Sequence, residues 1–348
     1  MSEPQPELKP VTSLDDVRRL MATLPGPCED AAAAAARHEA RLTKPAGALG
    51  RLEELSAWTA AWQGAHPPRA DTLLVCVFAG NHGVAARGVS AFPASVTEQM
   101  VANFEAGGAA INQICAVVGA RLKIVPLALD RPTADFTDQP AMEESACVAA
   151  INAGMAAVDD GVDILCLGEM GIANTTSAAA LACALFGGAA ADWVGAGTGV
   201  DDAGVERKRA AVEAAMATHG EALADPWEAL RRVGGRALAA IAGAVLAARL
   251  KRTPVLLDGY VCSAAAAVLA AATADGHGLD HCQLAHLSVE PGHRRLAEKL
   301  NKTPLLDLAM RLGEGTGAAL AAGLLRAAVQ THNGMATFAD AGVSGKTE

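Results

Sequence analysis

From residue 71 onward, short apolar runs alternate with alanine-rich segments of helical length. This alternation excludes more folds than any other feature of the sequence. The apolar runs predict strands at residues 72–78, 122–129, 162–167, 193–194, 255–257, 284–289 and 305–308. The segments between them predict helices at residues 93–105, 108–118, 142–159, 175–186, 204–218, 235–250, 261–273 and 317–328. Apolar strands separated by helices form parallel sheets that are covered on both faces. The sequence therefore predicts an α/β fold with ligands outside the carboxyl ends of the strands.

The two ends of the chain lack this alternation. Residues 12–16 place an N-cap residue before acidic residues, which predicts the start of a helix, and two further helices are expected before residue 64. The last residues are of mixed composition. We expect three segments: an N-terminal helical segment at 1–70, an α/β catalytic domain at 71–330 and a C-terminal tail at 331–348.

Composition excludes several classes of protein. The net charge of −10 and an aromatic content of 3% argue against a nucleic-acid surface, which needs clustered lysine and arginine. The longest uncharged apolar runs, at 178–191 and 237–248, fall short of the roughly 20 residues of a membrane span, so no membrane insertion is expected. The eight cysteines form no C-x-x-C pair, and no signal peptide is visible. A cytoplasmic protein is predicted.

The turn after the strand at 162–167 is rich in glycine and hydrogen-bond donors. It reads GEMGIANTTS over residues 168–177 and leads directly into a helix. Backbone N–H groups at a helix N-terminus, together with hydroxyl and amide side chains, form a site for phosphate. An ordinary N-cap by Asn174 or Thr175 is the alternative, but a cap needs one such residue and not four in a row. The pattern favours a phosphate site.

A second glycine-rich turn occupies residues 195–199. It does not match the dinucleotide-binding pattern G-x-G-x-x-G, because position 200 is valine. Downstream, Lys208 could reach back to a phosphate as a point charge. A solvated helix face is the other interpretation of the Arg207-Lys208-Arg209 cluster, and spacing alone does not separate the two.

A single carboxylate, Glu314, stands between Gly313 and Gly315 just before the last alanine-rich helix. Glycines permit backbone conformations closed to other residues and allow a ligand to approach closely. A carboxylate held in such a turn can act as a general base. The alternative is a simple electrostatic role at a helix N-terminus.

Histidines give weaker signals. His82 follows the first strand of the sheet and is more often a hydrogen-bonded scaffold residue than a catalytic one at such a position. His277, His281, Cys282 and His286 are close together in sequence, but their spacing matches no common structural metal site. No metal is predicted.

Five motifs occur in a specific order along the chain. They are FAG with HGV at 78–84, GEMG with NTT at 168–176, LLDG at 256–259, S-x-EPGH at 288–293 and RLGEGTG at 311–317. Together they strongly resemble the nicotinate-nucleotide:5,6-dimethylbenzimidazole phosphoribosyltransferase family of cobalamin lower-ligand assembly. The resemblance extends from Leu42 to Phe338. Asn81 and Ala173 depart from it, since they stand where the family usually has aspartate and glycine.

The resemblance implies a Rossmann-like three-layer fold with a small helical domain, built from the first 70 residues and the tail that packs on or near them. It also implies a homodimer without cofactors, which transfers the ribose 5-phosphate of nicotinate mononucleotide to dimethylbenzimidazole and gives α-ribazole 5′-phosphate and nicotinate. The resemblance assigns the catalytic base to Glu314 and a second carboxylate to Glu169. Together with the turns above, it predicts nucleotide or phosphate contacts at Gly171, Asn174, Thr175, Thr176, Gly197, Thr198, Gly199, Lys208, Ser288 and Gly292. The predicted pocket for the acceptor base consists of Phe92, Met100, Met170 and Leu312.

Three other functions would share part of this sequence pattern. A dinucleotide-dependent oxidoreductase would share the architecture, but the third glycine of its motif is missing. A nucleotide-binding module without catalysis would use the same phosphate turn. A transferase that uses phosphoribosyl pyrophosphate is disfavoured, because Asp201-Asp202 lacks the Thr-Gly that should complete that motif.

Overall fold

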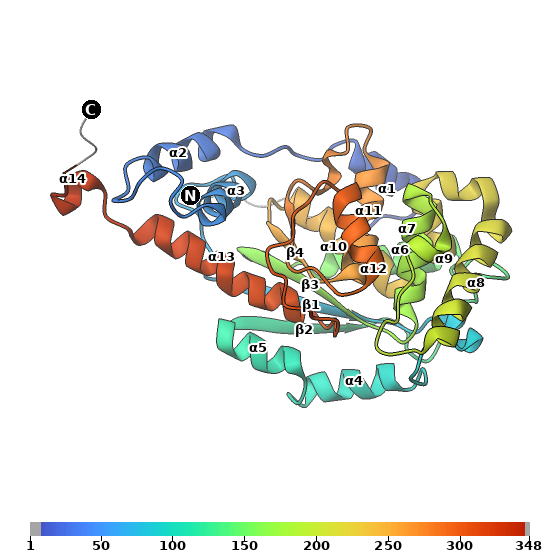
Figure 1. Cartoon of the computed structure of the whole chain (residues 1–348). Coiled ribbons are helices and arrows are strands. Elements are labelled where there is room, and N and C mark those ends of the chain that lie inside the picture. Colours follow the sequence, from blue (N-terminus) through green and yellow to red (C-terminus); the bar gives the residue numbers. More distant parts are fainter. Residues whose placement is uncertain (1–7, 345–348) are drawn as a thin grey trace.

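The computed structural model describes residues 8–344 and contains a five-stranded parallel sheet with the order β2-β1-β3-β4-β5 (Figure 1). The strands are β1 (Leu73–Ala79), β2 (Ala120–Pro126), β3 (Ile164–Met170), β4 (Val255–Leu257) and β5 (Cys282–Leu284). Every neighbouring pair runs parallel; for example, Val75 lies opposite Leu122 on one side and Cys166 on the other. The predicted three-layer α/β fold is confirmed.

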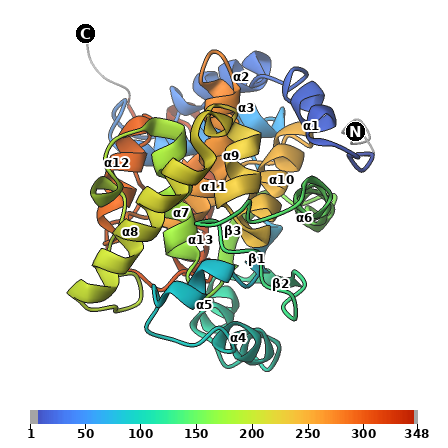
Figure 2. The ribbon, with the colours of Figure 1, turned by 90° about the vertical axis from the view of Figure 1, so that its right-hand side faces the viewer.

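Helices cover both faces of the sheet. The helices are α1 (Leu14–Met21), α2 (Glu29–Glu39), α3 (Arg51–Gln63), α4 (Val96–Glu105), α5 (Ala110–Val118), α6 (Glu144–Ala157), α7 (Asn174–Phe186), α8 (Asp202–His219), α9 (Pro226–Val233), α10 (Arg236–Leu250), α11 (Tyr260–Ala272), α12 (Pro291–Lys299), α13 (Thr316–Gly334) and α14 (Phe338–Ala341). Helices α4 and α5 lie on the opposite side of the sheet from α6, α10 and α11 (Figures 1 and 2). No helix within residues 8–344 combines the length and apolar content needed to cross a membrane.

The side chains of β1 point alternately to the two faces of the sheet and all are apolar, which explains why the sheet needs a helical layer on each face. Leu74, Cys76 and Phe78 are buried in the larger apolar core, with α6, α7, α10 and α11. Leu73, Val75 and Val77 point the other way into a second core, with α5 and α13. Successive strand side chains point to opposite faces, so a strand apolar throughout must be covered twice.

Several local predictions were wrong. Residues 193–194 follow a 3-10 turn and form no strand, and residues 305–308 contribute only an isolated bridge between Leu306 and His286. The strand expected at 284–289 ends at Leu284. Helices α9 and α12 were not predicted. Both are short, with eight and nine residues, so each offers only about two turns over which an amphipathic pattern can be recognised.

The order of the strands determines where a ligand can bind. The chain runs from β1 outward to β2, and then crosses to the other side of β1 to form β3. The reversal between β1 and β3 opens a crevice at the carboxyl ends of these strands. Strand β3 continues through Gly168 and Glu169 to Met170, and the glycine-rich turn that begins at Gly171 lies at this edge of the sheet.

The terminal helices lie in two places. Helix α1 packs on the larger core through Leu14, Val17 and Met21. Helices α2 and α3 lie instead beside the far end of α13 and near α14 (Figure 1). Backbone hydrogen bonds join the chain ends there, from Thr43 N to Ala336 O (3.1 Å) and from Phe338 N to Arg41 O (3.0 Å). The division at residue 70 stays a prediction.

The packing of α6 against α10 depends on two glycines. A Cβ added at Gly154 would lie 1.8 Å from Ala240 O, and one at Gly243 would lie 2.1 Å from Ile151 O. We expect Gly154→Ala to introduce roughly 3 kcal/mol of overpacking against about 1 kcal/mol gained in helix propensity. Urea denaturation should show a loss of roughly 2 kcal/mol in the free energy of unfolding. Gly26→Ala, where a Cβ meets nothing within 4 Å, serves as the control. Equal stabilities of the two variants would contradict the packing argument.

Candidate active site

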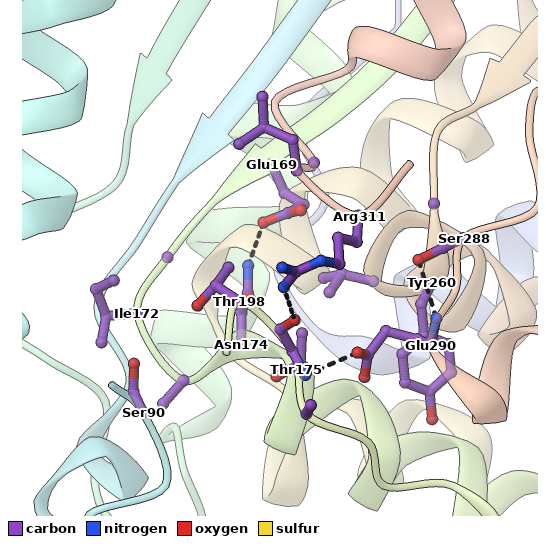
Figure 3. A pocket seen from close by; sticks show the side chains of 18 of the residues that line it. Ser90, Glu169, Ile172, Asn174, Thr175, Thr198, Tyr260, Ser288, Glu290 and Arg311 are labelled. Atoms are coloured by element: carbon purple, nitrogen blue, oxygen red, sulfur yellow. Dashed lines mark hydrogen bonds between the residues drawn. The ribbon is translucent and has the colours of Figure 1, made fainter. Parts of the chain in front are cut away.

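A narrow cavity lies at the carboxyl edge of the sheet, between the turn after β3, the loop at residues 195–200 and residues 311–313 (Figure 3). Its volume is about 90 Å³. The predicted site residues that line this cavity are Glu169, Met170, Gly171, Asn174, Thr175, Gly197, Thr198, Lys208, Ser288 and Leu312. They come from separate stretches of the sequence, which the parallel sheet brings together at one edge.

The start of α7 forms one wall of the cavity. Ala173 caps the helix with φ = 73°, in the left-handed region that usually favours glycine. Asn174 donates a side-chain hydrogen bond to the carboxyl group of Glu169. Thr175 faces Lys208, whereas the hydroxyl of Thr176 is buried, has no partner and does not line the cavity. The N-terminus of α7 and the Thr175 hydroxyl suit an anion, although the amides of Asn174 and Thr176 already donate to Gly171 O and Ala173 O.

Lys208 lies inside the protein and not on a solvated helix face. Its side chain, on α8, is only 2% exposed. The Nζ atom donates to Thr175 Oγ1 at 3.0 Å and to Gly195 O at 2.9 Å. Burial lowers the pKa of Lys208, an effect that the charge of Glu290 opposes. Of the two interpretations of this lysine, the structure supports a point charge directed at the phosphate turn.

The turn that carries Glu314 has a strained backbone. Gly313, Glu314 and Gly315 have φ values of 84°, 63° and 82°, and the middle residue is not a glycine. Such conformations cost free energy and persist where the surrounding structure enforces them, often at functional sites. The amide of Glu314 donates to Glu169 O at 3.2 Å, which attaches the turn to the end of β3.

Asp258, directly after β4, holds the same turn in place through hydrogen bonds. Its carboxylate accepts hydrogen bonds from Gly315 N (3.2 Å) and Ala318 N (3.0 Å) at the start of α13. The imidazole of His286 lies 3.4 Å from the same carboxylate, which raises the pKa of His286 although burial acts against it. Asp258 is fully buried and compensates both the helix N-terminus and the imidazole.

The two predicted catalytic carboxylates have unusual protonation properties. Glu314 is 5% exposed, and its Oε2 has no hydrogen-bond partner. Burial raises the pKa of Glu314 above the usual glutamate value. Burial and the negative charges of Asp258 and Glu314 raise the pKa of Glu169 to about 8. Raised pKa values of this kind make the ionised carboxylates stronger bases than exposed glutamates, which suits a general base.

An apolar hollow of about 500 Å³ adjoins the cavity. Phe92, Leu312 and Thr316 contribute to its walls, and Leu312 lines both spaces. Phe92 and Leu312 are about half exposed, at 49% and 51%. An open apolar slot beside a polar cavity can hold an aromatic ring.

The structure does not bring every predicted residue to these spaces. Met100 packs against the smaller core and lines neither the cavity nor the hollow, and Gly199 lines neither of them. Gly292 packs against the backbone that leads into the loop at residues 195–200, since a Cβ there would lie 2.6 Å from Trp193 O. Glu314 lines neither space, although Gly313 lines the cavity and Thr316 lines the hollow; the backbone amide of Ile111, at the start of α5, donates to its carboxyl group.

Four larger polar side chains that line the cavity, those of Tyr260, His286, Glu290 and Arg311, carried no predicted binding or catalytic role, and neither did Ser90. The first three follow β4 or β5 closely, so their position after a strand was the available signal. His82 is buried beneath the α7 turn, with Nδ1 2.9 Å from Ser177 Oγ, and burial lowers its pKa to about 4. This environment suits a scaffold residue. Within residues 8–344, no cluster of histidine, cysteine or acidic side chains is arranged to hold a metal.

These features first define a class: an α/β protein with a polar, glycine-lined cavity at a helix N-terminus and buried carboxyl groups beside it. A family model described as phosphoribosyltransferase matches residues 24–343. The nicotinate-nucleotide–dimethylbenzimidazole phosphoribosyltransferase of Rhizobium etli is 59% identical over 332 residues, which cover 95% of this chain and 97% of the relative. The corresponding protein of Methylocella silvestris is 58% identical over 333 residues, or 96% and 97% of the two chains.

A solved structure agrees with these relatives. The crystal structure of CobT from Thermus thermophilus superimposes with a TM-score of 0.85 and 42% identity, and the match covers 91% of this chain and all of that one. The chain belongs to the nicotinate-nucleotide–dimethylbenzimidazole phosphoribosyltransferase family.

The contacts of Lys208 lead to a test of the anion site. We expect Lys208→Met, which keeps the length of the side chain but removes its charge, to weaken binding of inorganic phosphate by roughly 10- to 100-fold. Isothermal titration calorimetry would measure this change. Lys299→Met removes a charge from the exposed surface of α12 and should leave the affinity unchanged. Unaltered phosphate affinity in Lys208→Met would place the anion elsewhere.

Proposed function

We propose that this chain transfers the ribose 5-phosphate of nicotinate mononucleotide to 5,6-dimethylbenzimidazole, which releases nicotinate and gives α-ribazole 5′-phosphate for assembly of the cobalamin nucleotide loop. The names of the relatives and the family match support this reaction. The structural observation that carries it is the attachment of the Glu314 turn to the end of β3, through the hydrogen bond from Glu314 N to Glu169 O. This bond ties the segment that carries the carboxylate to the strand end from which the proposed anion cradle follows, and so supports the proposal.

The reaction requires one general base from the protein and no general acid. Nicotinate leaves from a positively charged glycosidic nitrogen and takes the bonding electrons with it, so no general acid is required. The acceptor attacks through a neutral ring nitrogen, while its other ring nitrogen carries a proton. That proton becomes acidic as the new carbon–nitrogen bond forms, and a base within hydrogen-bond reach can remove it.

Glu314 is proposed to be this base. Its carboxyl group is buried and has a free oxygen atom, and the turn that carries it borders the polar cavity at Gly313 and the apolar hollow at Thr316. A raised pKa makes it a stronger base than an exposed glutamate. Its negative charge would also stabilise positive charge that develops on the ribose and on the acceptor ring.

Glu169 is proposed to support the same charge from the cradle side. Its pKa of about 8 leaves it largely protonated at neutral pH in the ligand-free cavity. A cationic nicotinate ring nearby would favour the ionised form. The hydrogen bond from Asn174 holds the carboxyl group in place for either state.

The cradle and the hollow would orient the two reactants. Phosphate bound by Thr175 and Lys208 would fix the anomeric carbon, and an oriented attack replaces a chance encounter. Phe92, Leu312 and Met170 would hold the flat acceptor ring. Attack from the face opposite nicotinate inverts the configuration and yields the α-ribotide. The homodimer and the cytoplasmic location stay predictions.

Removal of the proposed base should abolish most turnover. We expect Glu314→Gln to lower kcat by roughly two or more orders of magnitude, while nicotinate mononucleotide still binds. Chromatography of reactions with nicotinate mononucleotide and dimethylbenzimidazole would quantify free nicotinate and the α-ribotide. A variant with normal turnover would exclude Glu314 as the base, and a wild-type chain that forms neither product would exclude the reaction.

The raised pKa of Glu314 also predicts a pH dependence. A general base works only when ionised, so kcat/KM should fall as the pH decreases through the raised pKa of Glu314, above the ordinary glutamate value near 4.5. In Glu314→Gln this acid limb should disappear, and only the limb from protonation of the acceptor base should remain. Identical acid limbs in the two proteins would contradict the assignment.

A further inference from the structure

The loop at residues 195–200 is held over the cavity by three charged side chains. Lys208 donates to Gly195 O at 2.9 Å, and Arg311 Nη1 donates to Gly197 O at 3.1 Å. The N–H of Gly197 donates to Glu290 Oε1 at 2.7 Å. Both sides of the Gly197 residue are thus held by ionic groups, as Figure 3 shows for Glu290 and Arg311.

Glu290 is the unexpected member of this group. Its side chain faces the same cavity as Lys208 and Thr175, yet a carboxylate repels the phosphate that these residues suit. The residue is 7% exposed, and its second oxygen, Oε2, is buried without a hydrogen-bond partner. A buried carboxylate oxygen without a partner is costly, so a purely structural role leaves this atom unexplained.

The local backbone is shaped to accommodate this carboxylate. A Cβ added at Gly195 would lie 2.7 Å from Glu290 Oε2, and one at Gly197 would lie 2.8 Å from Lys208 Nζ. Glycine at both positions allows an anion and a cation to approach the loop closely. Glu290 is also the N-cap residue of α12, where the helix dipole favours negative charge.

The groups that would bind a phosphate are therefore already engaged. One backbone N–H holds a carboxylate, and the two cations hold carbonyl oxygens of the same loop. The remaining cavity, about 90 Å³, is smaller than the roughly 300–1,000 Å³ of typical small-molecule sites. A phosphate group that binds to the Gly197 amide and to the two cations must therefore displace the contacts that hold the loop.

We propose that Glu290 is an internal anion that occupies the Gly197 amide of the phosphate subsite and exchanges with the phosphate group of the nucleotide. The incoming phosphomonoester takes the Gly197 N–H and the two cations, and the Glu290 carboxylate withdraws. This inference rests on the proposed function for the identity of the nucleotide, but the exchange itself concerns any phosphomonoester. Glu290 thereby sets the affinity of the cradle.

The exchange has a use in the reaction. Substrate and product carry the same 5′-phosphate, so a cradle that only attracts phosphate would retain the product. A carboxylate that returns to the Gly197 amide competes with the phosphate of the product and favours its release. Glu290 is thus a residue that tunes binding, and no bond of the substrate is made or broken by it.

Removal of the charge alone tests the proposal. Glu290→Gln keeps an oxygen acceptor for the Gly197 N–H but loses the negative charge next to the phosphate. We expect the affinity for inorganic phosphate and for nicotinate mononucleotide to increase at least about tenfold, because a like charge is removed. Isothermal titration calorimetry on the full chain measures both ligands. Glu298→Gln, on the exposed surface of the same helix, controls for the change in net charge and should leave both affinities unaltered.

Three results would overturn the proposal. One is an unchanged or weaker phosphate affinity in Glu290→Gln. Another is a selective loss of ribose 5-phosphate affinity with inorganic phosphate unaffected, which would make Glu290 a sugar-binding residue. The third applies even if the variant does not fold: a phosphate-bound structure of the wild-type chain in which Gly197 N still donates to Glu290.

The same measurements separate this inference from the proposed function. A wild-type chain that converts nicotinate mononucleotide and dimethylbenzimidazole, with no gain in phosphate affinity in Glu290→Gln, refutes only the exchange. A wild-type chain that binds phosphate more weakly than Glu290→Gln but forms no α-ribotide refutes only the reaction.

Discussion

The close approach of two backbones, at the end of β3 and at the turn before α13, is the contact on which the site depends. A Cβ at Gly168 would lie 2.4 Å from Gly315 N, so only glycine allows the two segments to touch. The amide of Glu314 then reaches Glu169 O, and Asp258 secures the next amides of the turn. This contact joins the phosphate turn to the carboxylate turn although they are about 140 residues apart in the sequence.

The electrostatics of the site follow from that contact. Three carboxylates, Glu169, Asp258 and Glu314, lie close enough for their charges to affect one another. Burial and mutual repulsion favour the protonated forms of Glu169 and Glu314, whereas backbone amides and His286 stabilise Asp258. Lys208 is also buried, and the negative charge of Glu290 lies close enough to oppose the effect of burial on its pKa. The charged groups of the site thus form two sets, the three carboxyl groups around the Glu314 turn and Lys208 with Glu290 at the loop of residues 195–200.

The local backbone adds a further constraint. Ala173 and Glu314 both adopt left-handed conformations at the N-termini of helices that face the site. After Glu314 the amides of Gly315 and Ala318 donate to Asp258, whereas after Ala173 the amides of Asn174 and Thr176 donate to backbone oxygens of the same turn. This is strain at a functional site that the packing around it maintains. The apolar core on both faces of the sheet supplies the stability that tolerates it.

The sequence alone determined the layered fold, because strands apolar at every position require helices on both faces. It also singled out the turns at 168–177 and 313–315, since glycine next to polar residues is a local signal. It did not distinguish a solvated Lys208 from a buried one, nor reveal the pairing of Asp258 with His286, because both depend on which distant elements pack together. Met100 was expected near the ring pocket and packs in the smaller core instead, because the orientation of α4 decides where its side chain points. Local sequence patterns indicate the secondary structure that each segment favours. Contacts between distant segments form only when the strand order of the sheet brings those segments together.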